Sequence, residues 1–507
     1  METDKITSSY RKNLGETQTI VDVTMQNNDE ENIAKVLSCG AKAYVDEVEM
    51  LSGEAHYMGG VVFDLLFVDE TGASHVLSEK MDLQGKLEND QINPLMKPIY
   101  SVETLDCEVA SLEDGKAKLT ATVGIRLDAV ENDKVEEVRT DDDNIQLNKE
   151  IINAYNVVTS GTKTFEIDEE FDAKISASKV LLSTGHVDLK NIVDGTGYFT
   201  VDGNMFVNAL LEVQEDDANC LKNFMETIPF KEEFEDELIQ RGDEVVAFAF
   251  ARPQDLSVNI ESNEDSNAIK VHAVLTLKYI VQRQVQQEII TDAFSMTNKT
   301  NMKSGTFMTA KPQKVERFLA NIDGQSVLDD DEPRIAKVCA VTNEHILIAN
   351  TVLQNSELTI EGVAYMSVLY LTDDDVPVLN SVNLEIPFAN KFNVDENFDK
   401  NLYATSRILD VEAKAKKGKE INVNLDVCFL VYSYDIVNNA VVKDIELTEP
   451  LSKNEYSLEM YVAPKGSTLW DISKHLLANQ DTLVAQNPDL VFPLEEPQTI
   501  VHFRQNV

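Results

Sequence analysis

The sequence predicts a mainly β protein, with three repeated antiparallel β-sandwich-like domains followed by one small βααβ domain. Three observations lead to this fold class. Short strings recur three times along the chain, each copy contains a strictly alternating strand, and only the final segment has helical periodicity. A chain of 507 residues is also too long for one core, because domains usually hold roughly 100–200 residues.

The repeat consists of three motifs in a constant order. The first follows an acidic turn and reads "NIAKVLSC" from Asn32, "FDAKISAS" from Phe171 and "RIAKVCAV" from Arg334. The second is a glycine followed by an apolar run, at Gly59, Gly203 and Gly362. The third is "IPFKEEF" from Ile228 and "IPFANKF" from Ile386, with the weaker "MDLQGKL" from Met81. The spacing is too long for a solenoid repeat, so each copy is interpreted as a whole domain.

Each copy ends in a strand whose apolar residues occupy every second position. These residues are Leu119, Ala121, Val123, Ile125 and Leu127, then Ile269, Val271, Ala273, Leu275, Leu277 and Tyr279, and finally Ile421, Val423, Leu425, Val427, Phe429 and Val431. Such alternation is typical of a sheet with one buried and one solvated face. Before the first of these strands, Asp114-Gly115 predicts a hairpin turn.

The predicted domain boundaries follow from the repeat. They are residues 14–135, 160–285 and 314–451 for the three β domains, and residues 458–507 for the tail. Two similar segments lie between copies, at Asn148–Thr162 and Gln286–Thr300. These segments are interpreted either as plain linkers or as ordered connections that pack at the ends of units one and two.

The tail has a pattern of its own. Tyr461-Val462 indicates a short strand, and Thr468 with Asp471 indicates a helix N-cap. Leu469, Ile472 and Leu476 then share one helical face, which leaves Trp470 pointing away from it. A second helix near Asp481–Gln486 would bury Leu483 and end at Asn487-Pro488, and a last strand is expected over Thr499–Phe503.

This tail resembles a LysM domain. The match rests on Tyr461, Val462, Pro464, Gly466, Thr468, Leu469, Ile472, Leu483, Asn487, Pro488, Leu490 and Ile500. The resemblance implies a groove between the first turn and the loop after the second helix. The expected glycan- or partner-binding residues are Gly466, Ser467, Thr468, Trp470, Asn487, Pro488, Asp489 and Leu490. Trp470 is interpreted either as cover for the edge of the small core or as a partly exposed anchor for a partner.

A single LysM-like tail after three acidic β units is similar to the SPOCS-domain spore-coat morphogenetic proteins of endospore-forming Firmicutes. This resemblance covers roughly Leu14–Leu451, where copy one has Met81-Asp82-Leu83 in place of the I-P-F signature. It implies a scaffold made in the mother-cell cytoplasm that sits on the forespore surface. It further implies that the tail docks to a membrane-anchored coat ATPase and that the β units contact other coat proteins.

Composition excludes several other classes of protein. The net charge of −45 is spread along the chain without a basic stripe, which argues against nucleic-acid binding. The five cysteines show no C-x-x-C spacing and are expected as core residues in a reducing compartment, and neither a signal peptide nor a membrane span is expected. We find no hydrolase, phosphate-loop or metalloprotease motif, and acidic Asp373-Asp374-Asp375 is interpreted as a turn rather than a calcium site. We therefore expect no enzyme activity, no cofactor and no metal.

Two classes of function remain open from the sequence. One is an intracellular scaffold and adaptor in coat and cortex assembly. The other is a binding protein for a glycan that contains N-acetylglucosamine, either peptidoglycan or its lipid-linked precursor. The expected absence of a signal peptide favours the first, because polymeric peptidoglycan lies outside the cytoplasm.

Overall fold

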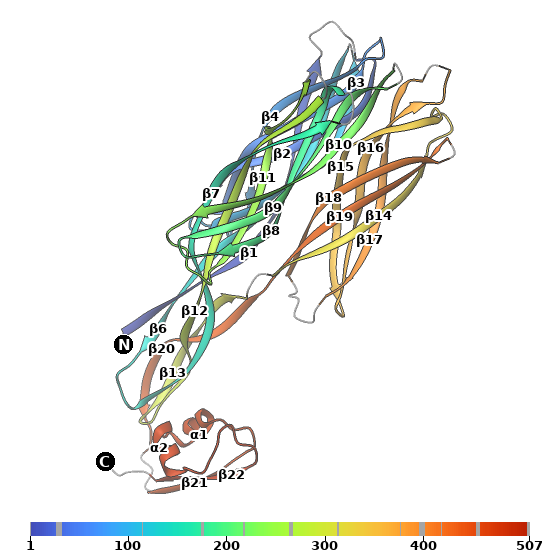
Figure 1. Ribbon diagram of the computed structural model, residues 1–507. Helices are drawn as coiled ribbons and strands as arrows, with labels where there is room; N and C mark the ends of the chain where they lie inside the picture. The colour runs from blue at the N-terminus through green and yellow to red at the C-terminus, as the bar shows by residue number, and fades with distance from the viewer. Residues whose placement is uncertain are drawn as a thin grey trace.

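The computed structural model describes residues 2–26, 33–113, 115–173, 177–215, 218–262, 267–311, 314–375, 377–394, 401–416, 418–452 and 457–503. Asn32, Asp114 and residues 174–176, which belong to motifs noted above, lie outside these ranges. The chain is mainly β, with antiparallel sheets throughout and two helices near the C-terminus, so the predicted fold class is confirmed at this level. Figure 1 shows three groups of strands at one end, a narrower bundle below them and the tail at the other end.

Each group, called here a unit, consists of two three-stranded antiparallel sheets. Unit one contains β1 (Glu2–Gln26), β6 (Lys116–Arg139) and β5 (Lys97–Glu113), and β2 (Lys35–Met50), β3 (Glu54–Val68) and β4 (Ser74–Glu88). Unit two contains β10 (Ala218–Glu235), β9 (Tyr198–Glu215) and β8 (Ala177–Asp194), and β11 (Glu244–Ser262), β12 (Asn267–Ser295) and β7 (Ile145–Ala173). Unit three contains β15 (Ile335–Gln354), β16 (Glu357–Thr372) and β17 (Leu379–Asn393), and β14 (Lys314–Val327), β19 (Glu420–Tyr434) and β18 (Asn401–Lys416).

The alternating strands form the middle strands β6, β12 and β19. Their predicted apolar faces are buried in the units, packed against residues of the opposing sheet such as Phe63, Phe199 and Tyr370. The predicted hairpin before β6 is confirmed, because Glu113 pairs with Lys116. In each unit, the face of the middle strand that the alternation predicted to be buried is therefore the face that is buried.

The recurring glycines have a packing role. Gly203 pairs with Phe230 and Gly362 pairs with Phe388, so each I-P-F phenylalanine covers a glycine on the neighbouring strand. A Cβ at Gly362 would lie 2.2 Å from the carbonyl oxygen of Leu347, and one at Gly59 would lie 2.0 Å from that of Tyr44. No side chain fits in that space, which explains why these positions carry glycine.

Below the units lies a bundle that we call the stalk, made of residues 2–13, 128–157, 282–310 and 436–450. It contains the ends of β1 with β6 and of β7 with β12, together with the ribbon of β13 (Asn298–Ala310) and β20 (Ile436–Pro450). Its core is formed by Ile6, Val135, Val138, Ile145, Ile289, Ile290, Ala293, Phe307, Val441, Val442 and Ile445. Strands β1, β6, β7 and β12 run from units one and two into the stalk without ending. The predicted domain boundaries stay predictions.

The two similar segments, 148–162 and 286–300, are not plain linkers. Residues 148–162 belong to β7, and Gln286 to Ser295 of the other segment belong to β12. They pair with each other inside the stalk, with Gln287 opposite Ile152. Their likeness therefore reflects two strands of one ribbon, which agrees with the ordered alternative.

The three units meet in an apolar cluster that includes residues of both edge and middle strands. Leu37 and Leu66 of unit one, Leu181 and Leu210 of unit two, and Leu369 of unit three share one apolar cluster.

Hydrogen bonds also cross every boundary between units. The Nζ of Lys42 donates to the carbonyl of Ser183 at 3.1 Å, the side chain of Asn223 exchanges two 2.8 Å bonds with the backbone of Val341, and Ser38 pairs with Thr342 at 3.0 Å. The units are thus joined by both apolar and polar contacts.

Candidate functional site

The tail folds in the predicted order, with β21 (Leu458–Ala463), α1 (Leu469–Leu476), α2 (Gln480–Gln486) and β22 (Gln498–Phe503). Thr468 and Asp471 form the expected capping box at the start of α1. The core of the tail contains Ala463, Ile472, Leu476, Ala478, Leu483, Leu494 and Ile500. It is separate from the cores of the units and the stalk.

The first predicted site segment is a tight turn. Gly466 has a φ of +84°, a conformation that favours glycine, and its N–H donates to the carbonyl of Leu494 at 2.8 Å. The hydroxyl of Ser467 donates to the carbonyl of Pro464 at 2.8 Å. Gly466 and Thr468 are exposed and Ser467 is half-buried. This turn is therefore hydrogen-bonded to Leu494, in the segment before β22.

The second predicted segment is held by Asn487. Its amide donates to the carbonyls of Leu483 and Val501 and accepts from the N–H of Val501 at 2.9 Å, which ties the end of α2 to β22. Pro488 and Asp489 are exposed, and Leu490 packs partly against the tail core. Asn487 therefore has a structural role in the tail.

Trp470 lies outside the tail core and contacts the stalk. Its Nε1–H donates to Oδ2 of Asp292 at 2.9 Å, and its ring centroid is 5.2 Å from that of Phe294. Lys474 donates to both carboxylate oxygens of Asp292, at 2.8 and 2.6 Å. Burial alone would raise the pKa of Asp292, but the hydrogen bonds from Lys474 and Trp470 hold that pKa below its usual range. Trp470 thus anchors the tail to its own chain, an arrangement that neither interpretation of the sequence had included.

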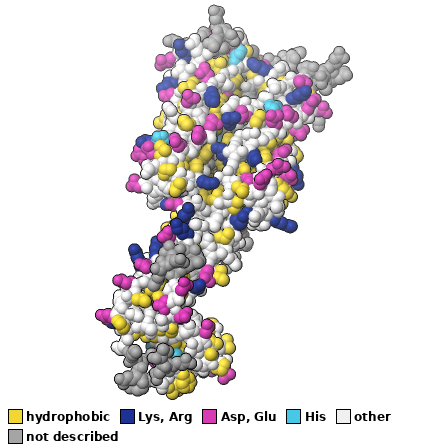
Figure 2. All heavy atoms as spheres, turned by 90° about the vertical axis from the view of Figure 1, so that its left-hand side faces the viewer, with side chains coloured by type: hydrophobic (Ala, Val, Ile, Leu, Met, Phe, Trp, Pro, Cys, Tyr) yellow, Lys and Arg dark blue, Asp and Glu magenta, His cyan; other side chains and the backbone are white. Residues whose placement is uncertain are grey.

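The outer face of the tail sheet is apolar and exposed. Leu458 pairs with Phe503 and Met460 pairs with Val501, and Val462 continues the same face. The exposed fractions of Leu458, Met460, Val462 and Phe503 are 47%, 66%, 66% and 53%. Figure 2 shows hydrophobic side chains at this end of the molecule, as elsewhere on the visible face, where they are interspersed with acidic and basic ones. We call Leu458, Met460, Val462 and Phe503 the apolar face of the tail.

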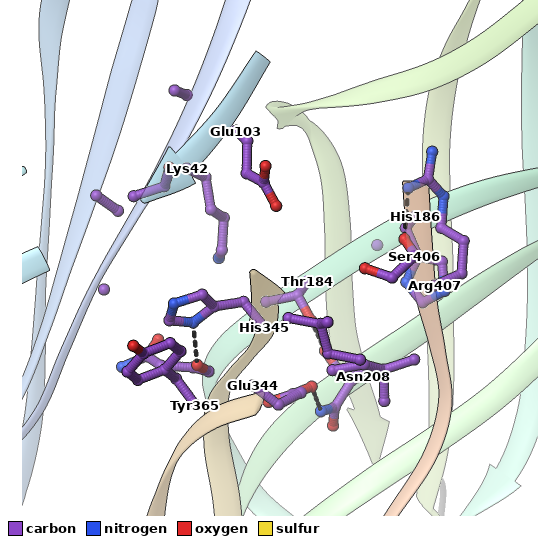
Figure 3. A pocket seen from close by; sticks show the side chains of 18 of the residues that line it. Lys42, Glu103, Thr184, His186, Asn208, Glu344, His345, Tyr365, Ser406 and Arg407 are labelled. Atoms are coloured by element: carbon purple, nitrogen blue, oxygen red, sulfur yellow. Dashed lines mark hydrogen bonds between the residues drawn. The ribbon is translucent and has the colours of Figure 1, made fainter. Parts of the chain in front are cut away.

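A second candidate site lies between the three units. It is a cavity of about 1460 Å³, called here the chamber, and its walls include the edge strands β2, β5, β8, β11, β15 and β18. His186 stacks on Phe206 with ring centroids 4.9 Å apart, and His345 stacks on Tyr365 at 5.1 Å. Figure 3 shows His186, His345 and Tyr365 around an open centre, with Glu103 on one side and Arg407 on another.

Enclosure by protein shifts the protonation of the chamber groups. Burial lowers the pKa of His186 to about 3 and also lowers that of His345, so both imidazoles are neutral at pH 7. Burial raises the pKa of Glu103 to about 7, against the opposing effect of Arg407. It also raises the pKa of Glu344, whose carboxylate accepts a 2.7 Å bond from Asn208. Two imidazoles of the chamber are therefore neutral at pH 7, and the pKa values of two of its carboxyl groups are raised.

Comparison of the chain with protein-family models, curated proteins and solved structures returned no match in any of the three. Among the residues that the structure describes, no helix has the length and apolar character needed to cross a membrane. Within the same residues, no group of three or more His, Cys, Asp or Glu side chains is arranged to hold a metal ion. The five cysteines are free thiols, and two of them, Cys220 and Cys428, are buried.

Sequence reasoning missed the chamber and the use of Trp470. His186 and His345 line one cavity although they lie far apart in the sequence and belong to different units. His272 lies on the solvated face of β12, with 45% of its side chain exposed, and its Nδ1 lies 2.7 Å from Oδ1 of Asp168. The recurring motifs were one signal that could have indicated such a site, because they showed that the three copies contain equivalent strands.

Proposed function

We propose that this chain is a non-catalytic scaffold and adaptor in spore coat and cortex assembly. It would act in the mother-cell cytoplasm at the forespore surface. In this proposal, residues 14–135, 160–285 and 314–451 are SPOCS-like domains, and residues 458–507 are a LysM-like domain that docks to the coat-basement ATPase. The sequence resemblances support these assignments, as does a tail with its own core at the end of a long stalk.

The apolar face of the tail is the observation that carries this proposal. Four large apolar side chains on one face of a two-stranded sheet remain exposed, although the other face packs a core. Contiguous exposed apolar residues of this kind are typical of protein interaction sites. Two copies of a chain with a net charge of −45 repel each other, so the proposed partner is a different protein with basic residues around an apolar patch.

The predicted groove and Trp470 stay part of this proposal. Gly466 and Asp489 are exposed and accessible in the free chain. Trp470 is half-buried against Phe294, so a partner that uses it must first displace the tail from the stalk.

Capture of the ATPase by variants of the full chain tests the proposal. Met460→Ser should lower the affinity by a factor of roughly 10 to 100, because burying such a side chain contributes about 1.5–3 kcal/mol. Val484→Ser is the matched control, since Val484 is also an exposed aliphatic residue, 44% accessible, but lies on α2. Equal binding by the Met460 and Val484 variants would remove the apolar face from the interface.

Sedimentation with purified peptidoglycan separates this proposal from glycan binding. We expect weak or no sedimentation of the full chain. Saturable sedimentation that is lost when Gly466 or Asp489 is substituted, together with no capture of the ATPase, would instead identify a glycan-binding protein.

A further inference from the structure

The chamber is formed by the same part of each unit. Six of the edge strands that line it, two from each unit, carry register shifts, for example between Val36 and Ser38 in β2 and between Val180 and Leu182 in β8. β10 and β17, which also contribute to the lining, pair without such shifts, as do β4 and β14. Bulges of this kind redirect side chains and are frequent next to binding sites.

One bulge determines what β5 presents to the chamber. Thr104 pairs with Val123 and Asp106 pairs with Thr122, so Leu105 is the extra residue. As a result Glu103, Asp106 and Glu108 share the strand face opposite the unit core, and all three line the chamber. This wall is acidic and exposed to the interior of the chamber.

Arg407 provides the opposite charge. The other cations in the lining have carboxylate partners, as in the pairs Lys42–Asp64, Arg126–Glu16, Arg252–Asp255 and Arg11–Asp128. Arg407 instead donates from Nη1 to the carbonyl of Ser406 at 2.7 Å, and its Nε is buried without a hydrogen-bond partner in the described part of the chain. A partly buried guanidinium with no carboxylate partner is costly unless an anion or water reaches it.

Glu103 and Arg407 are therefore two groups of opposite charge that line the same cavity. Neither forms an ion pair with another described residue, and Figure 3 places them on different sides of the open centre. Guanidinium groups pair with carboxylates in a planar, two-bonded geometry, and a carboxylate pairs with an ammonium group. A ligand that carries both charges would satisfy both residues without changing the net charge of the chamber.

We propose that the chamber binds a small zwitterion, with its carboxylate on Arg407 and its ammonium group on Glu103. A free amino acid or a short peptide has this chemistry. The chamber exceeds the roughly 300–1,000 Å³ of ordinary ligand sites, so a short peptide fits as well as a single amino acid. The acidic wall of β5 disfavours a small dianion such as phosphate.

Calorimetry on the full chain tests this site with defined probes. Glycine and triglycine represent the free amino acid and the short peptide, whereas acetate, methylammonium and inorganic phosphate each carry one sign of charge. We expect saturable heat from at least one zwitterion and at least tenfold weaker binding of the other three. No saturable heat from either zwitterion up to about 10 mM, or equally tight binding of acetate, would overturn the proposal.

Two substitutions examine the two contacts separately. Arg407→Gln and Glu103→Gln should each weaken zwitterion binding at least tenfold, and Arg407→Lys should weaken it less because it keeps the charge. Arg241→Gln is the control, since Arg241 is exposed in the segment before β11 and does not line the chamber. The melting temperature of each unliganded variant reports whether it is folded. Glu103 projects into the chamber, so its variant should fold even if Arg407→Gln does not, and unchanged binding by a folded Glu103→Gln would refute the assignment.

Discussion

Docking of the tail on the stalk should depend on the negative charge of Asp292. The Asp292→Asn substitution keeps the shape of the side chain and an oxygen that can accept from Trp470. It removes the charge that Lys474 and the indole N–H now share. We therefore expect the variant to remain folded while the tail spends more time away from the stalk.

The size of the effect follows from the contacts that are lost. A hydrogen bond to a charged group contributes about 1.5–3 kcal/mol and one to a neutral group about 0.5–1.5 kcal/mol, so the indole contact should lose about 1 kcal/mol. The ion pair with Lys474 is partly exposed and adds about 0.2–1 kcal/mol. The total of about 1–2 kcal/mol corresponds to a roughly 5- to 30-fold shift toward the undocked tail. The contact between Phe294 and Trp470 is retained only while the tail of this variant is docked.

Tryptophan fluorescence measures the shift directly, because Trp470 is the single tryptophan of the chain. Release from Phe294 and Asp292 exposes the indole, so Asp292→Asn should give red-shifted emission and stronger quenching by acrylamide. Glu288→Gln is the matched control, since Glu288 pairs with Lys149 elsewhere on the stalk at 2.8 Å. Identical quenching of wild type and Asp292→Asn, or an equal change in the control, would refute the docking argument.

Three further predictions concern the tail core and the chamber. Leu483→Ala should destabilise the tail by about 2–5 kcal/mol, because Leu483 is buried in a small core, and calorimetry should show a lower tail transition with the main transition unchanged. Asn487→Ala removes the amide that bonds Leu483 and Val501 and should cost about 1–3 kcal/mol, seen as faster amide exchange at Val501; unchanged exchange would contradict the clamp. The pKa of His186 is lowered to about 3, so the unfolded chain takes up this proton near pH 6.5 while the folded chain does not, and stability should fall as the pH drops from 6.5 toward 3. Urea unfolding at several pH values should show that the free energy of unfolding falls less with decreasing pH in His186→Gln than in the wild type. An equal dependence on pH in both proteins would count against burial of the imidazole.

The sequence correctly predicted those parts of the fold that depend on residues close together in the chain. Alternation from Leu119 to Leu127 correctly placed the buried face of β6, and Thr468 with Asp471 correctly placed the start of α1. Periodicity and capping are properties of neighbouring residues, so one sequence is enough to recognise them.

Features that depend on distant contacts were not predictable in this way. The bulge at Leu105 is defined by pairing with β6, and nothing in the string around it distinguishes it from a regular strand. The chamber requires Glu103, His186 and Arg407 to converge from three units. Trp470 could be placed on the correct side of its helix, but its partner Phe294 lies in a segment for which a linker had been considered.

The stalk also constrains the order in which the chain can be completed during synthesis. Its first ribbon joins Glu2 to Arg139 and its second joins Ile145 to Ser295, so both can close while the chain is still growing. The third ribbon joins Asn298 to Pro450, with all of unit three between its strands. Pairing over such long separations is slow, because the entropy of loop closure is lost before the contacts form. Asp292 and Phe294, which hold Trp470, belong to the second ribbon, so the docking surface for the tail can form before the tail itself has been made.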